Sequence, residues 1–324
     1  MGKVKIMNHK DGSVKVVLTA VVVNFFVTLA KSVGWMISMS PSMLAEAIHS
    51  FADTANQLLV YLGIRISRKG PTREYPAGYG QARYLWNLIS ASGIFFIGFG
   101  VTVYHGVSSL LNPHPDAQFS YGLGIGILIF SLLVEGYAFI IAYKEVYSKK
   151  GSLTFNMFIR ESDDPTSIGV LLEDGIAVIG VFLALSGMAI SNYLHSQIPD
   201  AIASILIGIL LGVLAVIMAY MNGRLLINRS LSLSDEDEIR KFILALDTVD
   251  KITVLKTEII APDQVKLSLE IDFNASFIEE NISDDSVSNI IQKSVKGVGK
   301  AINEMEKQIQ NRFPNIKYID LEIN

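Results

Sequence analysis

The chain has 324 residues, of which 50% are hydrophobic and 18% are charged, and its mean hydropathy of +0.41 excludes an ordinary soluble domain. The charge is uneven, because residues 1–229 carry a net +3 and residues 230–324 a net −7. This contrast predicts a membrane domain over 1–229 and a soluble domain over 230–324. The acidic second part argues against nucleic-acid binding, and the lack of cysteine excludes disulfides and thiolate metal ligands.

Six apolar stretches are long enough to cross about 30 Å of hydrocarbon at about 1.5 Å per residue. No cleaved signal peptide is expected, because the lysine-rich first residues lack an apolar stretch and a small-residue cleavage site. We therefore predict a six-helix transmembrane domain. The expected spans are Val16–Ser38, Met43–Ile64, Tyr84–Leu110, Tyr121–Tyr143, Thr166–Met188 and Pro199–Met221.

Basic residues alternate between the connections. The turns between helices one and two, three and four, and five and six contain no lysine or arginine, whereas the other flanks are basic. By the positive-inside rule, both termini are predicted to be cytoplasmic. The sequence favours a bacterial inner membrane, with an organellar membrane as the alternative.

The acidic tail is expected to contain a helix, two strands, a second helix and a last strand. An acidic start caps the first helix, the strands alternate in polarity, and a proline ends the long second helix. This order predicts a small cytoplasmic α+β domain of ferredoxin-like type. The elements are Ser234–Leu246, Ile252–Ile260, Gln264–Phe273, Ser283–Phe313 and Tyr318–Ile323.

Polar residues cluster in the second predicted span. His49 and Asp53 are four residues apart and Asn56 follows three later, so all three lie on one helical face. Ionisable groups inside a bilayer cost about 2.5–3.5 kcal/mol each on insertion scales, which favours a functional role. An imidazole and a carboxylate at this spacing supply half of a tetrahedral metal site. A hydrogen-bonded pair that only joins two helices is the alternative.

The fifth predicted span offers a counterpart in Glu173 and Asp174. Asp174 lies about 15 Å along the helix from Asp164, which is close to the middle of the bilayer and comparable in depth to His49 and Asp53. Ligands from two helices at one depth are suited to a transported cation. A structural carboxylate pair that faces a water-filled cavity is the alternative.

Two motifs resemble those of a known family. The stretch Ala45–Asp53 (AEAIHSFAD) is similar to the helix-two H-x-x-x-D motif of the cation diffusion facilitators, and Tyr79–Tyr84 (YGQARY) resembles the stretch before their third helix. The segments Gly93–Phe96 and Tyr104–Gly106 are most similar to the zinc-transporter-nine-like subgroup. The resemblance covers nearly the whole chain and implies six helices with a cytoplasmic α-β-β-α-β domain.

The resemblance also implies a ligand set. His49 and Asp53 match the helix-two metal ligands, and Asp174 matches one ligand of the helix-five pair. The other member of that pair is expected at Val170, which cannot bind a metal. The candidates for the fourth position are Glu173, Asn56 and water.

The family function implied is export of a divalent metal by exchange for protons, in a homodimer embedded in the lipid bilayer. Zn²⁺ is the expected substrate, with Mn²⁺, Fe²⁺ and Co²⁺ as alternatives, and no cofactor beyond the transported metal is expected. We expect metal to enter beside Asp163 and Asp164 and to compete with protons for the ligands. Residues 230–324 contain no histidine, which argues against histidine-bound metal there.

Other functional classes fit less well. The chain has no H-E-x-x-H, nucleophile or phosphate-loop motif, so a secondary transporter is expected rather than an enzyme. The aliphatic Val170 favours one alternative, a non-transporting regulatory or partner subunit with the same fold.

Overall fold

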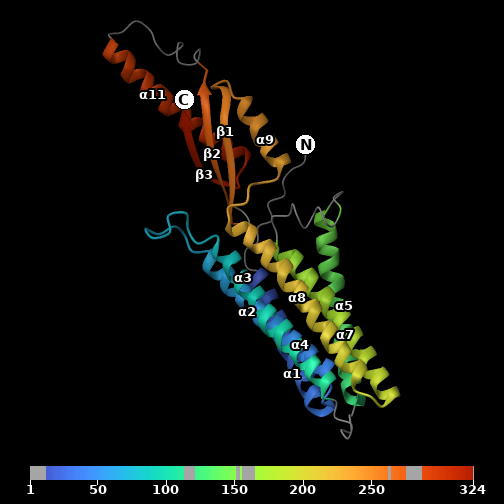
Figure 1. Cartoon of the computed structure of the whole chain (residues 1–324). Coiled ribbons are helices and arrows are strands. Elements are labelled where there is room, and N and C mark those ends of the chain that lie inside the picture. Colours follow the sequence, from blue (N-terminus) through green and yellow to red (C-terminus); the bar gives the residue numbers. More distant parts are fainter. Residues whose placement is uncertain are drawn as a thin grey trace. The chain divides into compact units, whose positions relative to one another are not determined.

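The computed structural model describes residues 12–112, 121–150, 154, 165–261, 264–274 and 287–323 (Figure 1). The chain divides into two compact units. One comprises Met1–Pro71 and Ala82–Gly223, and the other comprises Thr72–Gln81 and Arg224–Asn324. The loop over 72–81 therefore groups with the C-terminal unit, although hydropathy alone assigns it to the membrane domain.

The first unit is a bundle of long helices that run side by side (Figure 1). One of them is continuous in three parts, because α3 passes into the π-helix η1 and then into α4. The described helices are α1 (Gly12–Ser38), α2 (Pro41–Ser67), α3 (Ala82–Gly93), η1 (Ile94–Val101), α4 (Thr102–Leu111), α5 (Tyr121–Lys150), α7 (Pro165–Leu194) and α8 (Ile198–Leu226).

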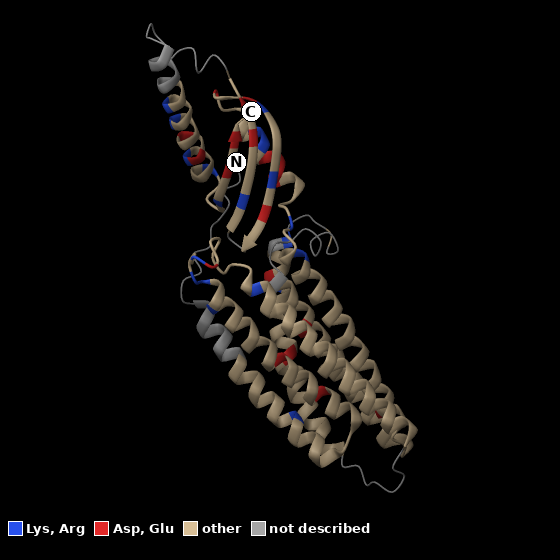
Figure 2. Ribbon diagram, turned by 60° about the vertical axis from the view of Figure 1, so that its left-hand side comes forward, with Lys and Arg blue, Asp and Glu red and all other residues tan. Residues whose placement is uncertain are grey.

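Five helical segments among the described residues are long and apolar enough to cross a membrane: Val21–Ser38, Ala82–Leu111, Tyr121–Ser148, Ser167–Leu194 and Ile198–Leu226. They make the chain a multi-pass membrane protein. Charged residues are few along these helices and dense in the C-terminal unit (Figure 2). The 27-residue α2 does not belong to this apolar set. The sixth span predicted from the sequence therefore stays a prediction.

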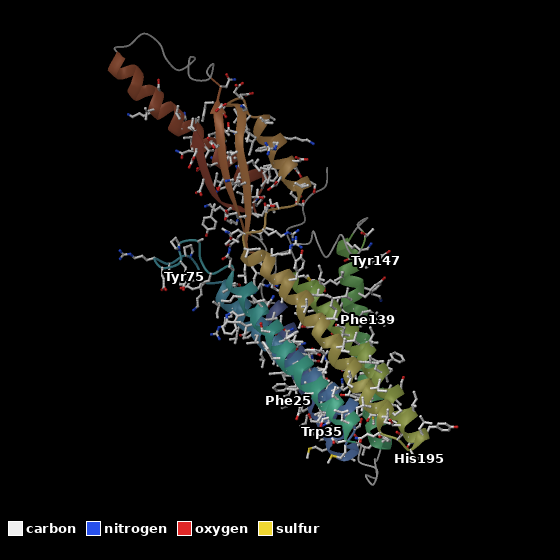
Figure 3. The ribbon with its side chains drawn as sticks, in the orientation of Figure 1. Phe25, Trp35, Tyr75, Phe139, Tyr147 and His195 are labelled. Atoms are coloured by element: carbon white, nitrogen blue, oxygen red, sulfur yellow. The ribbon has the colours of Figure 1, made fainter. Side chains whose placement is uncertain are left out.

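Two helices continue beyond the ends predicted from the sequence. Residues 189–194 were expected in a loop, but α7 continues to Leu194, and α5 continues past Tyr143 to Lys150. Inside α7, the buried Ser191 hydroxyl accepts from the Asp200 N–H at 3.0 Å. Hydropathy falls before the helix ends because a membrane helix can extend beyond the hydrocarbon layer of the bilayer into polar surroundings. Trp35 and His195 lie toward one end of the bundle and Tyr147 toward the other (Figure 3).

Helix α8 approaches the segment from η1 to α4 closely. A Cβ at Gly208 would lie 2.7 Å from a side-chain carbon of Val103, and one at Gly212 would lie 3.0 Å from the Phe99 ring. The two glycines are four residues apart, a spacing that lets helix backbones pack closely in membranes. Buried side chains from the helices, including Met43, Leu128 and Leu211, fill the centre of the bundle.

The C-terminal unit is a small α+β region with three strands in the order β1-β2-β3. Strand β1 pairs antiparallel with β2, and β2 pairs parallel with β3. This element order was predicted from the sequence; the ferredoxin-like type stays a prediction, and part of the second predicted helix, 283–286, lies outside the described residues. The elements are α9 (Leu233–Leu244), β1 (Val249–Ala261), β2 (Gln264–Phe273), α11 (Val287–Arg312) and β3 (Ile316–Ile323).

The core of this unit follows from the alternation along β2, where Val265, Leu267, Leu269 and Ile271 are buried and their neighbours are not. Helix α9 packs on β1 and α11 on β3. The Tyr318 hydroxyl of β3 donates to the carbonyl of Ala77 at 3.2 Å, which attaches the 72–81 loop to this unit.

Candidate metal site

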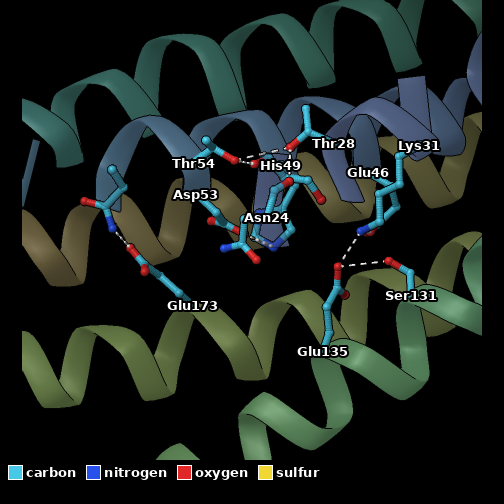
Figure 4. Close-up of polar contacts among 12 residues, drawn as sticks. Asn24, Thr28, Lys31, Glu46, His49, Asp53, Thr54, Ser131, Glu135 and Glu173 are labelled. Atoms are coloured by element: carbon cyan, nitrogen blue, oxygen red, sulfur yellow. Dashed lines mark hydrogen bonds and ion pairs between the residues drawn. The ribbon is translucent and has the colours of Figure 1, made fainter. Parts of the chain in front are cut away.

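His49 and Asp53 lie one turn apart on α2, as their spacing requires. The start of this helix is fixed by the Ser40 hydroxyl, which accepts the Met43 N–H at 3.1 Å, and by Pro41 in the first turn. The His49 Nε2 and Asp53 Oδ2 atoms are 3.4 Å apart. The histidine side chain is 1% exposed and the aspartate side chain 16%. The predicted pair is therefore adjacent and enclosed (Figure 4).

The imidazole of His49 is unusual because it is buried without hydrogen bonds. Among the described residues, neither Nδ1 nor Nε2 has a hydrogen-bond partner. Buried polar atoms are nearly always paired, so an orphaned imidazole requires an explanation such as an ion or water at the site. Neutral imidazole is a common metal ligand. Within the part of the chain that the structure describes, neither histidine nitrogen is thus hydrogen-bonded, and Nε2 faces the Asp53 carboxylate at 3.4 Å.

Asn56 connects α2 to two further helices. Its amide nitrogen donates to Glu173 Oε1 of α7, and its amide oxygen accepts from the Ser90 hydroxyl of α3 at 2.5 Å. Glu173 is 5% exposed, so this amide is a hydrogen-bond donor to a buried carboxylate. Both residues were candidates for the fourth ligand, and the structure brings them into contact with each other.

Helix α7 turns Glu173 rather than Val170 toward the bundle interior. Glu173, Ala177 and Val181 are buried at four-residue intervals, which marks the packed face of the helix. Val170 is 44% exposed and lies on the outer side of this face. Asp174 is partly buried and interacts electrostatically with Asp53 and Glu173. Three carboxylates from α2 and α7 therefore lie within electrostatic range of one another.

The side chains do not form a closed cage in this structure. Within the described ranges, no group of three or more His, Asp or Glu side chains has the geometry of a metal site. The ligand assignments to His49, Asp53 and Asp174 thus remain predictions, as do those to Glu173 and Asn56. Asp163 and Asp164, the expected point of metal entry, lie outside the described residues.

A second polar group lies next to this site. The Lys31 ammonium of α1 is bound by Glu46 of α2 and Glu135 of α5, each at 2.7 Å (Figure 4). The sequence marks all three as polar residues in apolar segments, but it gives no sign that they meet. Their contact depends on how α1, α2 and α5 pack, which no local pattern encodes.

Comparison with known proteins gives a family model and relatives that cover most of the chain. Residues 17–227 match the model of the cation efflux transmembrane domain. Metal tolerance protein C4 of Arabidopsis thaliana is 33% identical over 96% of this chain and 73% of its own length.

The human mitochondrial proton-coupled zinc antiporter SLC30A9 is 30% identical over 96% of this chain. The chain spans 59% of the length of that human protein. Magnetosome protein MamB of Magnetospirillum gryphiswaldense is 25% identical over 60% of this chain and 71% of its own length.

Proposed function

The chain belongs to the cation efflux family, and from this premise we propose that it exports divalent metal ions, Zn²⁺ foremost, from the cytoplasm in exchange for protons. The relatives named as proton-coupled zinc antiporters support both the metal and the coupling. The basic connections, which the positive-inside rule assigns to the cytoplasm, support the direction. In this proposal α2 is the sixth membrane span, and two copies of the chain form a homodimer.

The observation that carries the proposal is the buried His49 imidazole with two unbonded nitrogens beside Asp53. A neutral imidazole and a carboxylate, one turn apart, present nitrogen and oxygen donors to the same ion. Zn²⁺ accepts this mixed set readily, whereas Mn²⁺ and Fe²⁺ tolerate it with more oxygen ligands. A purely structural histidine is expected to hydrogen-bond through both nitrogens, whereas Nδ1 of His49 has no partner among the described residues and Nε2 only faces Asp53 at 3.4 Å.

We assign Asp174 and Glu173 of α7 to the remaining positions, with Asn56 as the donor that orients Glu173. The hydrogen bond between Asn56 and Glu173 joins α2 to α7 beside the His49–Asp53 pair. A small relative movement of these helices would bring the carboxylates around one ion, as expected for a transporter in which helices rock against each other.

Proton coupling follows from the same ligands. Histidine and carboxylates bind metal only when deprotonated, so metal and protons compete for them. Protonation of any of these groups therefore removes a ligand from the ion. Metal bound from the cytoplasm is then released on the opposite side when protons take its place.

The test is metal/proton exchange by the purified full chain in proteoliposomes. Asp53→Ala should abolish Zn²⁺ uptake and the accompanying proton flux. Asp250→Ala, which removes an exposed carboxylate at the start of β1, is the matched control and should transport as the unaltered protein does. Near-normal exchange by Asp53→Ala would overturn the assignment.

The same preparations separate the candidates for the fourth ligand. If Glu173 binds the ion, Glu173→Ala should reduce metal affinity in equilibrium dialysis about tenfold or more, as does loss of a ligand or its direct support. Unchanged affinity would assign the position to Asn56 or water.

A second candidate function is a non-transporting subunit with the same fold. The aliphatic, outward-lying Val170 at the expected ligand position favours it. Metal flux by the purified chain alone decides between the two, because a regulatory subunit would bind metal or a partner without transport.

A further inference from the structure

The Lys31 ammonium lies between two carboxylates from different helices. Its Nζ atom is 2.7 Å from Glu46 Oε2 and 2.7 Å from Glu135 Oε1, and Ser131 donates to the same Glu135 oxygen at 3.1 Å. The side chains of Lys31 and Glu46 are 0% exposed and that of Glu135 is 14% exposed. When both carboxylates are ionised, the ammonium leaves one negative charge uncompensated within the group, which we call the ion triad.

Half of the carboxylate oxygens in the ion triad are unused. Glu46 Oε1 and Glu135 Oε2 are buried and have no hydrogen-bond partner among the described residues. A buried carboxylate is costly unless it is paired and its remaining lone pairs are bonded. An ammonium meets each of these carboxylates through one oxygen only. A divalent cation can bind a carboxylate through one or both oxygens and neutralises two negative charges, so the donor set also suits such an ion.

Helix α7 leaves room for the unpaired oxygen of Glu46. A Cβ placed on Gly180 would collide with Glu46 Oε1, so the glycine allows this carboxylate to extend from α2 against the α7 backbone. The carboxylate therefore bridges Lys31 on one side and α7 on the other. The absence of a side chain at Gly180 therefore lets Glu46 Oε1 pack directly against α7.

The ion triad is close to the proposed transport site. Glu46 is one turn before His49 on α2, and both Lys31 and Glu135 interact electrostatically with His49 and Asp53. Glu135 also interacts electrostatically with Asp174. A cation that exchanges with Lys31 would therefore be within range of the ligands assigned above.

We propose that Glu46 and Glu135 form a second divalent-cation site with oxygen ligands, which the Lys31 ammonium occupies as a tethered cation and which the transported metal enters by displacing it. The site rests on the proposed function for the identity of the ion. Carboxylate and hydroxyl oxygens favour hard ions, so Mn²⁺ is the sharper probe and Zn²⁺ the second. Lysine holds the site while no metal is there and so keeps two buried carboxylates from facing each other unpaired.

The experiment counts bound metal on the purified full chain in lipid nanodiscs, by equilibrium dialysis against Mn²⁺ and against Zn²⁺. Lys31→Met removes the competing cation, so it should bind one further ion per chain or bind it at least about tenfold more tightly than the unaltered protein. The double variant Lys31→Met with Glu135→Gln is the matched control. It removes one charge of each sign and should not gain the ion.

A triad that serves only to hold three helices together predicts a different pattern. Lys31→Met would then lose stability without gaining metal, and Glu135→Gln added to it would restore stability. That result would overturn the proposal. If Lys31→Met does not fold, Lys31→Gln serves as the second variant, because a neutral polar side chain removes the competing charge and does not compete with a divalent cation for the carboxylates. Failure of a folded Lys31→Gln to gain the ion would equally overturn it.

A further pair of variants separates this inference from the proposed function. Asp53→Ala alone should lose the transport-site ion, whereas Asp53→Ala with Lys31→Met should retain the ion gained at Glu46 and Glu135. If Asp53→Ala loses no metal, the proposed transport site is wrong while the gain in Lys31→Met still tests the ion triad. If only the gain is missing, the transport site stands and the second site does not.

Discussion

Gly180→Ala tests whether Glu46 needs the space beside α7. Alanine is preferred to glycine in a helix interior by about 1 kcal/mol, so the substitution should stabilise α7 if nothing opposed it. Here the added methyl would collide with Glu46 Oε1, in a carboxylate that also binds Lys31 at 2.7 Å. Forcing an extra methyl group into a packed interior costs about 1–3 kcal/mol, and Glu46 keeps its other oxygen for Lys31. Set against the gain in helix propensity, the expected net loss of stability is up to about 2 kcal/mol.

The assay is thermal unfolding of the detergent-solubilised full chain, followed by circular dichroism. Gly126→Ala on α5 is the matched control, because a Cβ there meets no atom within 4 Å. This control should leave stability unchanged or raise it slightly through helix propensity. Both variants make the same chemical change inside a membrane helix, so their difference isolates the contact with Glu46.

A double variant examines the cause directly. Glu46→Asp shortens the carboxylate by one methylene and withdraws it from Gly180. Gly180→Ala together with Glu46→Asp should lose less stability than the two single losses added, with a coupling of about 1 kcal/mol or more. The reasoning is refuted if Gly180→Ala unfolds at the same temperature as the Gly126→Ala control. It is also refuted if the stability losses of Gly180→Ala and Glu46→Asp simply add in the double variant.

Three further predictions concern other polar contacts. Asn56→Ala, which removes the amide that joins α2 to α7, should lower stability by about 1–3 kcal/mol in thermal unfolding, because it leaves a buried carboxylate unbonded. Asn222→Ala removes the buried oxygen that accepts a hydrogen bond from the Asn87 amide at 3.0 Å. The loss of stability should be only about 0.6 kcal/mol, as is typical of polar contacts between membrane helices, and a loss above about 1.7 kcal/mol would contradict this. In the C-terminal unit, the hydrogen bond and charge of Asp320 raise the pKa of Lys266 above its ordinary value of 10.5. The stabilisation that the ion pair gives to the folded state is complete below about pH 10.5 and is lost as the pH rises through the raised pKa. Lys266→Met should therefore lower the stability of the fold at neutral pH and have no effect in strong alkali.

The order and type of most elements were accessible from the sequence because hydrophobic runs and alternation are local signals. The apolar helices and the three strands follow from them. The His49–Asp53 pair was equally accessible, because a spacing of four on one helix fixes the adjacency without knowledge of packing.

Contacts between helices were not accessible in the same way. Nothing local indicates that Lys31 meets Glu46 and Glu135, which are separated from it by 15 and 104 residues. The same limit applies to α7, where the sequence shows two adjacent acids but not which one turns inward. Burial of Glu173 and exposure of Val170 depend on how α7 is rotated against its neighbours, and this rotation is decided by packing over the whole helix.

The low hydropathy of α2 has its origin in one face of the helix. Glu46, His49 and Asn56 are buried, and the polar stripe that they form contacts other helices rather than the surroundings of the bundle. The residues that α2 does expose include Phe51 and Leu58, which are 54% and 45% exposed and apolar. A helix whose polar groups point inward and whose outer side chains are apolar is suited to a lipid environment. An average over a window of residues mixes the two faces, so the helix that carries the proposed metal ligands falls outside the set of apolar spans. Its burial pattern supports our proposal that it is the sixth span.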